Sequence, residues 1–196
     1  MLYYERKFSS KGYRLIAGVD EAGRGPLAGP VVSAAVILKT RRFKNRIDDS
    51  KLLTALEREN AFPEIKEKAY LGLGVISEKI IDRINILEAT SLSMRRAISF
   101  LGLKPDFVLI DGNVPLDIGS PFENIIHGDA KSLSIACASI IAKVTRDRIM
   151  EGYHRKWPEY GFRKHKGYGT KSHLEALRKF GPSPIHRLSF HGVRKV

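Results

Sequence analysis

Two apolar runs near the amino terminus, separated by a short glycine-rich stretch, constrain the fold more than any other feature. The first strand is predicted over Tyr13 to Asp20, and Pro30 to Leu38 is a second run rich in valine. The runs are close enough in sequence to pair as a hairpin. Later strand-like runs, Leu71 to Ile76 and Phe107 to Ile110, alternate with helical patterns. A hairpin followed by this alternation predicts an α/β fold with a mixed central sheet flanked by helices.

Helical periodicity predicts four longer helices. They span Thr54 to Lys68, Asn85 to Leu101, Ser132 to Met150 and Thr170 to Phe180. Thr54 is a suitable N-cap for the first of them, but Pro63 leaves open whether that helix is broken.

The charge of the chain favours a nucleic-acid partner. Its 196 residues include 34 Lys and Arg but only 21 Asp and Glu, which gives a formal net charge of +13. Such a basic excess is the usual electrostatic signature of a protein that binds nucleic acid. A surface adapted to high temperature would instead add both signs about equally.

The basic residues are densest towards the carboxy terminus. Residues 151–196 contain eleven Lys and Arg, three Glu and five of the six histidines. We interpret residues 1–150 as the main domain and residues 151–196 as a small basic helical lobe packed on it, the two forming one functional unit.

Several other classes of protein do not fit the sequence. Residues 1–11 carry charges and lack the apolar centre of a secretory signal. The longest apolar stretches, Val31 to Leu38 and Ile135 to Ala142, are about eight residues long and too short to cross a bilayer. We therefore expect a cytoplasmic protein with no membrane partner. The lone Cys137 lies in an apolar setting and is expected to be a core residue.

The glycines do not form a nucleotide-cofactor motif. Gly23, Gly25 and Gly29 are spaced one residue too widely for the dinucleotide fingerprint. The sequence also lacks the G-x-x-x-x-G-K-[ST] loop that binds the phosphates of ATP.

Acidic residues follow three of the strand-like segments. Asp20 and Glu21 stand at the end of the first strand, Asp111 follows Phe107 to Ile110, and Asp129 follows a short apolar pair, Ile125-Ile126. Because ligand sites of α/β sheets gather at strand ends, these acids are expected to converge. Clustered carboxylates repel one another, and divalent cations such as Mg²⁺ remove that conflict. Two such ions could hold the attacking and leaving oxygens of a phosphodiester. The alternative is that each Asp only begins a turn.

One geometric condition applies to the adjacent pair. Consecutive residues of a regular strand point to opposite faces, so Asp20 and Glu21 both face one metal only if the strand ends at Asp20. Gly23 and Gly25 make such an end plausible.

The turn after the acids has the residues needed to bind a phosphate backbone. Gly23 and Gly25 let a sugar-phosphate chain approach closely. Arg24 between them offers a planar fork of donors that matches phosphate.

Two other places offer a choice of interpretations. Ser139 and Lys143 lie four residues apart on one face of the long predicted helix. They form either its solvated side or a surface that faces the crevice and holds a phosphate. Tyr168, between two glycines and amid basic residues, is either a stacking platform or a packing residue.

Together these motifs resemble those of the type 2 ribonucleases H, and of bacterial ribonuclease HII in particular. The resemblance covers nearly the whole chain, with the motifs in the family's order. The matching segments are Gly18 to Pro30, Asp48 to Lys51, Val108 to Gly112, Gly128-Asp129 with Ser139 to Asp147, His165 to Thr170, and Pro184 to Arg187.

The resemblance implies a ribonuclease H-like fold and assigns roles to individual residues. The family's catalytic and metal-binding carboxylates match Asp20, Glu21, Asp111 and Asp129. Its Gly-Arg-Gly motif, whose backbone contacts the ribonucleotide 2′-OH and neighbouring phosphates, matches Gly23-Arg24-Gly25. Tyr168 matches a tyrosine that stacks on the deoxyribose beyond the junction. Lys51 and Ser139 correspond to positions near the phosphate backbone.

The implied activity is that of an endoribonuclease. It would hydrolyse the RNA strand of RNA/DNA hybrids and cut 5′ to single ribonucleotides in duplex DNA, leaving 3′-OH and 5′-phosphate ends. Two Mg²⁺ or Mn²⁺ ions are implied in the active complex. We expect a monomer, and the sequence leaves a sliding-clamp partner open.

Two other functions compete with this interpretation. One is another enzyme of ribonuclease H-like fold, such as a DNA resolvase or the type 1 enzyme, which would not need to recognise a 2′-OH beside Asp20. The other is a non-catalytic nucleic-acid-binding module in which the acids are only turn residues.

Overall fold

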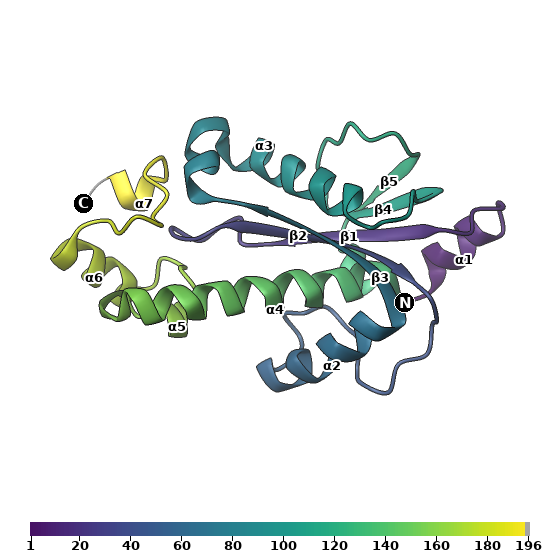
Figure 1. The fold of residues 1–196 in the computed structure, drawn as a ribbon, viewed down its shortest axis with the longest axis horizontal. Helices are drawn as coiled ribbons and strands as arrows, with labels where there is room; N and C mark the ends of the chain where they lie inside the picture. The colour runs from purple at the N-terminus through teal and green to yellow at the C-terminus, as the bar shows by residue number, and fades with distance from the viewer. Residues whose placement is uncertain (195–196) are drawn as a thin grey trace.

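A five-stranded sheet lies between helices in the computed structural model, which describes residues 1–194 (Figure 1). The last two residues of the predicted basic lobe therefore lie outside the described part. The elements in chain order are α1 (Tyr3–Ser9), β1 (Ile16–Ala22), β2 (Val31–Leu38), α2 (Ala55–Lys68), β3 (Ala69–Ile76), α3 (Glu78–Ser99), β4 (Phe107–Asp111), β5 (Phe122–Ile125), η1 (Gly128–Ala130), α4 (Leu133–Lys156), η2 (Pro158–Tyr160), α5 (Phe162–His165), α6 (Lys171–Phe180) and α7 (His191–Arg194).

The sheet is mixed, as the sequence predicts. Its strand order is β3-β2-β1-β4-β5. β1 pairs antiparallel with β2, from Ala17 opposite Ile37 to Ala22 opposite Val32, which confirms the predicted hairpin. β1 also pairs with β4 in parallel, and β4 pairs with β5 in parallel. The carboxyl ends of β1, β4 and β5 therefore lie at one edge of the sheet.

Helix α3 covers one face of the sheet, and α4 with α2 covers the other (Figure 1). Successive residues of β1 serve the two faces alternately. Ala17 and Val19 pack in one apolar cluster with Met94 of α3. Gly18 faces α4 so closely that a Cβ atom there would collide with the backbone of Ser134. This close approach brings α4 against the end of β1 that carries Asp20.

The structure answers one question that the sequence left open, and it moves the end of the first strand. Helix α2 continues through Pro63 without a break. Its start is held by a capping box between Thr54 and Glu57, and Ala61 and Ile65 anchor it in the core. Strand β1 does not end at Asp20, because Glu21 and Ala22 still pair with β2.

Helix α4 connects the sheet to the carboxy-terminal segments. It extends six residues beyond the predicted end at Met150, to Lys156, and so crosses the boundary proposed between main domain and lobe. Beyond it, short helices pack around a second apolar cluster that includes Met150, Phe162 and Leu177. Among residues 1–194, no helix combines the length and apolar character needed to cross a membrane.

Candidate active site

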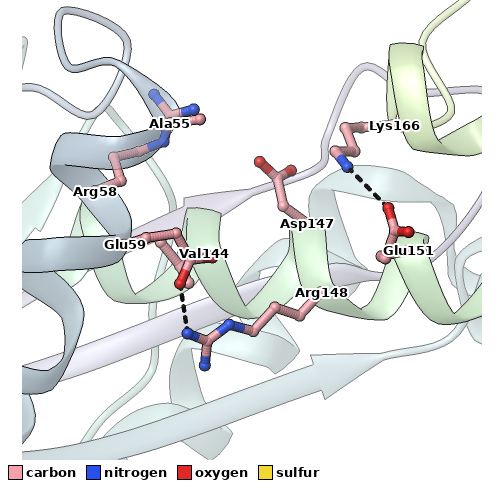
Figure 2. Close-up of a pocket in the computed structure, with 8 residues that line it drawn as sticks. All are labelled: Ala55, Arg58, Glu59, Val144, Asp147, Arg148, Glu151 and Lys166. Atoms are coloured by element: carbon pink, nitrogen blue, oxygen red, sulfur yellow. Dashed lines mark hydrogen bonds and ion pairs between the residues drawn. The ribbon is translucent and has the colours of Figure 1, made fainter.

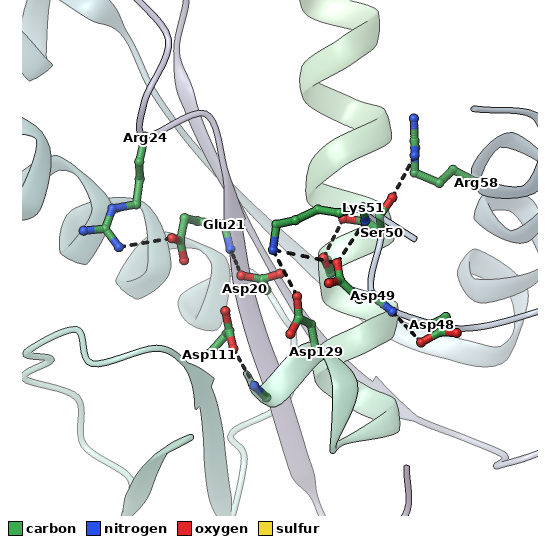
Figure 3. Close-up of polar contacts among 12 residues, drawn as sticks. Asp20, Glu21, Arg24, Asp48, Asp49, Ser50, Lys51, Arg58, Asp111 and Asp129 are labelled. Carbon is green, nitrogen blue, oxygen red and sulfur yellow. Dashed lines mark hydrogen bonds and ion pairs between the residues drawn. The ribbon is translucent and has the colours of Figure 1, made fainter. Parts of the chain in front are cut away.

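Three carboxylates converge at the sheet edge (Figure 3). Asp20 lies in β1, Asp111 ends β4, and Asp129 lies in η1 just before α4. Each offers an oxygen atom, and these three oxygens all lie within 4.8 Å of one another. The parallel register of β1 and β4, with Val19 opposite Ile110, brings Asp20 and Asp111 side by side. The expected convergence of the three aspartates is therefore present in the fold.

The cluster is electrostatically strained. Burial raises the pKa of Asp20 well above its usual value, and the charges of Glu21 and Asp111 raise it further. Burial and the charge of Asp111 also raise the pKa of Asp129. Among the described residues, one cation lies against the cluster, the Lys51 ammonium, whose Nζ is 3.2 Å from Asp129 Oδ2. Two amides also donate to the cluster, that of Glu21 to Asp20 at 2.7 Å and that of Gly128 to Asp111 at 2.6 Å. Three like charges beside a single ammonium form a site suited to hard cations.

Glu21 belongs to the same cavity but not to the three-oxygen cluster. Because β1 continues, Glu21 faces the other side of the strand, and its Oε1 lies 3.4 Å from Nη1 of Arg24 (Figure 3). Burial raises the pKa of Glu21, and the Arg24 charge partly offsets this. Its other oxygen, Oε2, is buried and has no hydrogen-bond partner among the described residues. The condition for Asp20 and Glu21 to point the same way is not met, yet both carboxylates line one crevice.

A cavity of about 280 Å³ lies beside the acids. Every residue predicted to bind substrate lines it: Gly23, Arg24, Gly25, Lys51, Ser139, Lys143 and Tyr168. Ser139 and Lys143 thus face the crevice rather than forming a solvated side of α4. Burial lowers the pKa of Lys143, and its Nζ lies 2.7 Å from Oδ1 of Asp147.

The loop before α2 contributes residues to which the sequence interpretation gave no role. The Ser139 hydroxyl donates to the Ser50 hydroxyl at 2.8 Å, and Ser50 also lines the cavity. The carboxylate of Asp49 accepts from the Lys51 amide at 2.9 Å, and its charge also raises the pKa of Asp129. Arg58 donates to the Ser50 carbonyl and so holds this loop on α2. Both residues lie in the Asp48 to Lys51 segment that matches the family, and this match is the sequence signal that could have found them.

The backbone of Tyr168 is held by hydrogen bonds to buried histidines. Nδ1 of His173 lies 2.9 Å from the Tyr168 carbonyl, which can only accept, so Nδ1 carries the proton. Nε2 of His173 then accepts from Nε2 of His186 at 3.0 Å. Nδ1 of His186 accepts from the Ser183 amide at 2.9 Å. Both rings are neutral in this arrangement, and burial lowers the pKa of each to about 4. The backbone of Tyr168 is therefore fixed while its ring stays half-exposed.

A second hollow, of about 200 Å³, lies between α2 and α4 (Figure 2). Its acids are engaged in ion pairs, Glu59 with Arg148 and Glu151 with Lys166. Asp147, which also lines it, pairs with Lys143. Each of these three acids is paired with a cation, whereas Asp20 and Asp111 in the crevice have no ion-pair partner among residues 1–194.

Comparison with known proteins decides the family. The family model described as Ribonuclease HII matches residues 17–193. The chain belongs to the ribonuclease HII family. A ribonuclease HII from Acholeplasma laidlawii is 53% identical over 197 aligned residues, covering 100% of this chain and 96% of that protein. The family consists of metal-dependent endoribonucleases that act on RNA/DNA hybrids.

Solved structures agree with the ribonuclease HII assignment. The ribonuclease H2 of Pyrococcus horikoshii superposes with a TM-score of 0.79 at 28% identity, over 93% of this chain and 96% of that one. An Archaeoglobus fulgidus ribonuclease HII, solved in complex with PCNA, gives 0.78 at 28% identity, over 90% and 95%. The predicted ribonuclease H-like fold is thereby confirmed.

Proposed function

We propose that this ribonuclease HII cuts duplex DNA on the 5′ side of a single embedded ribonucleotide, in addition to the RNA strand of hybrids. The observation that carries the proposal is the glycine-rich turn beside the acids. Gly23, Arg24 and Gly25 line the same cavity as Asp20 and Asp111. Only the 2′-OH distinguishes one ribonucleotide from its neighbours, and closely approaching backbone groups can recognise it.

The donor set fits divalent metal. Asp20, Glu21, Asp111 and Asp129 would hold two Mg²⁺ or Mn²⁺ ions, since all four offer hard oxygen ligands at one crevice and Glu21 Oε2 has no hydrogen-bond partner within residues 1–194. Such a pair of ions, when bound, supplies an activated water and stabilises the leaving 3′ oxygen. The products would carry 3′-OH and 5′-phosphate ends.

The remaining residues bind and orient the substrate. Arg24, half of whose side chain is exposed, and the ammonium groups of Lys51 and Lys143 would neutralise phosphates along the crevice. The hydroxyl of Ser139 would orient a phosphate or the neighbouring Asp20. The ring of Tyr168 would stack on the sugar beyond the cut. All these groups come from a single chain, so we propose a monomeric enzyme.

The test uses a labelled DNA duplex that carries one ribonucleotide, incubated with Mg²⁺. An all-DNA duplex and the Asp129→Asn variant serve as controls. We expect one cut, 5′ to the ribose, that is absent from both controls. Cleavage of a long RNA/DNA hybrid without this cut would indicate type 1 specificity. Cleavage of the all-DNA duplex at a similar rate would instead indicate an enzyme that does not recognise ribose.

A further inference from the structure

Arg187 is a buried cation whose partners are backbone carbonyls. Its side chain is fully buried, and its guanidinium donates to the carbonyls of Gly29, Arg24 and Gly23 at 2.9, 2.8 and 2.6 Å. No ion pair joins it to an acid within residues 1–194. A buried charge is tolerated only when its donors are satisfied. The orientation of the three carbonyls is therefore fixed, because together they accept the hydrogen bonds of this guanidinium.

The contacts to Gly23 and Arg24 also fix the direction of the next two amides. A trans peptide is planar, and its N–H points opposite to its C=O. With the carbonyls of Gly23 and Arg24 turned towards Arg187, the N–H groups of Arg24 and Gly25 point away from it. Both residues line the cavity and Arg187 does not, so these N–H groups face the crevice. In the described part of the chain, neither donates to a protein acceptor.

We infer that Arg187 is a positioning residue that holds the Arg24 and Gly25 N–H groups towards the ribose 2′-OH and its phosphate. Two successive free amides form a concave donor site for an oxygen ligand. The glycine at position 23, with φ of +98°, permits the required turn. This inference deepens the proposed function and rests on it, because it names what aims the ribose-recognising backbone.

A second buried arginine offers a matched comparison. Arg146 is equally buried and also donates to three carbonyls, those of Pro30, Ala28 and Lys166, at 3.0, 3.1 and 3.0 Å. It therefore anchors the far end of the same loop to the carboxy-terminal lobe. Its side chain also lines the crevice and packs against Gly23, but it donates to neither the Gly23 nor the Arg24 carbonyl. Loss of its guanidinium should weaken the fold without turning the two amides.

The experiment compares wild type, Arg187→Lys and Arg146→Lys in binding. Lysine keeps the charge but cannot reach three carbonyls from one ammonium. Fluorescence anisotropy, in EDTA to prevent cleavage, gives the Kd for a duplex with one ribonucleotide and for its all-DNA counterpart. We expect wild type to prefer the ribonucleotide. Arg187→Lys should reduce this preference about five-fold, as the loss of about one hydrogen bond predicts. Arg146→Lys should lower Tm but keep the preference.

The outcomes separate this inference from the proposed function. No preference in wild type would contradict ribose recognition itself, whatever Arg187 does. A clear preference that a folded Arg187→Lys variant retains would overturn the positioning role. If both arginine variants lose the ribonucleotide preference equally, Arg187 has only a structural role and the inference is wrong.

A second variant covers the case in which Arg187→Lys does not fold. Gly25→Pro removes one crevice-facing N–H and leaves the Arg187 side chain itself unchanged. Gly25 is exposed, so little packing should be lost. We expect Tm near that of wild type and a lost ribose preference. A retained preference would rule out the amide as a donor, and with it the inference.

Discussion

Two polar clusters lie near the Gly23-Arg24-Gly25 turn, and they differ in how far their polar groups find partners within the protein. In the acidic crevice, formed by Asp20, Asp111 and Asp129, like charges lie together and burial raises the pKa values of Asp20 and Asp129. In the basic cluster, formed by Arg146, His173, His186 and Arg187, nearly every ring nitrogen and guanidinium donates to or accepts from a fixed partner.

The difference shows where stability and function reside. The basic cluster is complete within the protein, so it can fix the backbone of Tyr168 and of the glycine-rich turn. The acidic crevice is incomplete, and a cation from outside would relieve its repulsion. Local rules of protein stability are commonly broken at functional sites and supported by the surrounding structure. The four predictions that follow test this contrast.

The largest effect is expected from breaking the acidic crevice. Asp111→Asn removes one proposed metal ligand, and cleavage of the ribonucleotide duplex should fall by about 10³-fold or more, since metal stabilisation is worth several kcal/mol. Substrate Kd should change little, because no phosphate contact is lost. Asp117→Asn, an exposed aspartate on the following loop, is the control and should cleave at the wild-type rate. Full activity in Asp111→Asn would favour the non-catalytic binding module.

A smaller effect is expected from removing the Tyr168 ring, whose backbone the basic cluster holds. Tyr168→Ala should reduce kcat/KM by about 5–150-fold, which corresponds to the ~1–3 kcal/mol of a stacking contact. Tyr168→Phe keeps the ring and should remain close to wild type. If both variants cleave equally well, the ring does not stack on the substrate.

Acidification should weaken the basic cluster. His173 and His186 have pKa values of about 4 in the folded protein and near 6.5 when unfolded. Their contribution to stability is therefore complete above pH 6.5 and is lost as the pH falls from 6.5 towards 4. We expect Tm to fall by at least about 2–4 °C over this range, the equivalent of about 1 kcal/mol for a domain of this size.

The crevice acids act in the opposite sense, because carboxyls with raised pKa values stabilise the fold as the pH falls. A His186→Asn variant isolates the histidine contribution and should lose less stability than wild type on acidification. His191→Asn, at an exposed histidine, should follow the wild-type curve. If the Tm of wild type falls no more steeply with decreasing pH than the Tm of His186→Asn, the histidines are not the cause of the loss of stability.

The smallest effect is a gain in stability from relieving the crevice. In EDTA at neutral pH, Asp20→Asn should raise Tm by about 2–4 °C, since a neutral side chain escapes the burial and repulsion that raise the pKa of Asp20. Added Mg²⁺ should raise the wild-type Tm and have less effect on the variant. Differential scanning calorimetry measures both, and a lower Tm for the variant in EDTA would show that the crevice is not strained.

Much of the fold follows from local patterns. The hairpin of β1 and β2, the mixed sheet and the four long helices correspond to apolar runs and helical periods that are visible over 5–20 residues. Asp20, Asp111 and Asp129 were also predictable as a group, because each follows a strand-like segment. Local patterns could not show that β1 continues past Asp20, since that depends on pairing with β2.

The sequence by itself determined which elements form and which acids end them, because hydrophobic period and turn chemistry are local. Only the tertiary structure decided which groups meet across long separations. Arg187 reaches the carbonyls of Gly23 and Arg24 from more than 160 residues away, and Asp129 meets Lys51 across 78. Backbone carbonyls are present at every residue and carry no sequence signal. The sequence therefore cannot show which carbonyls a buried arginine will contact. Those partners are decided only when packing excludes water from the guanidinium and leaves nearby carbonyls to accept its hydrogen bonds.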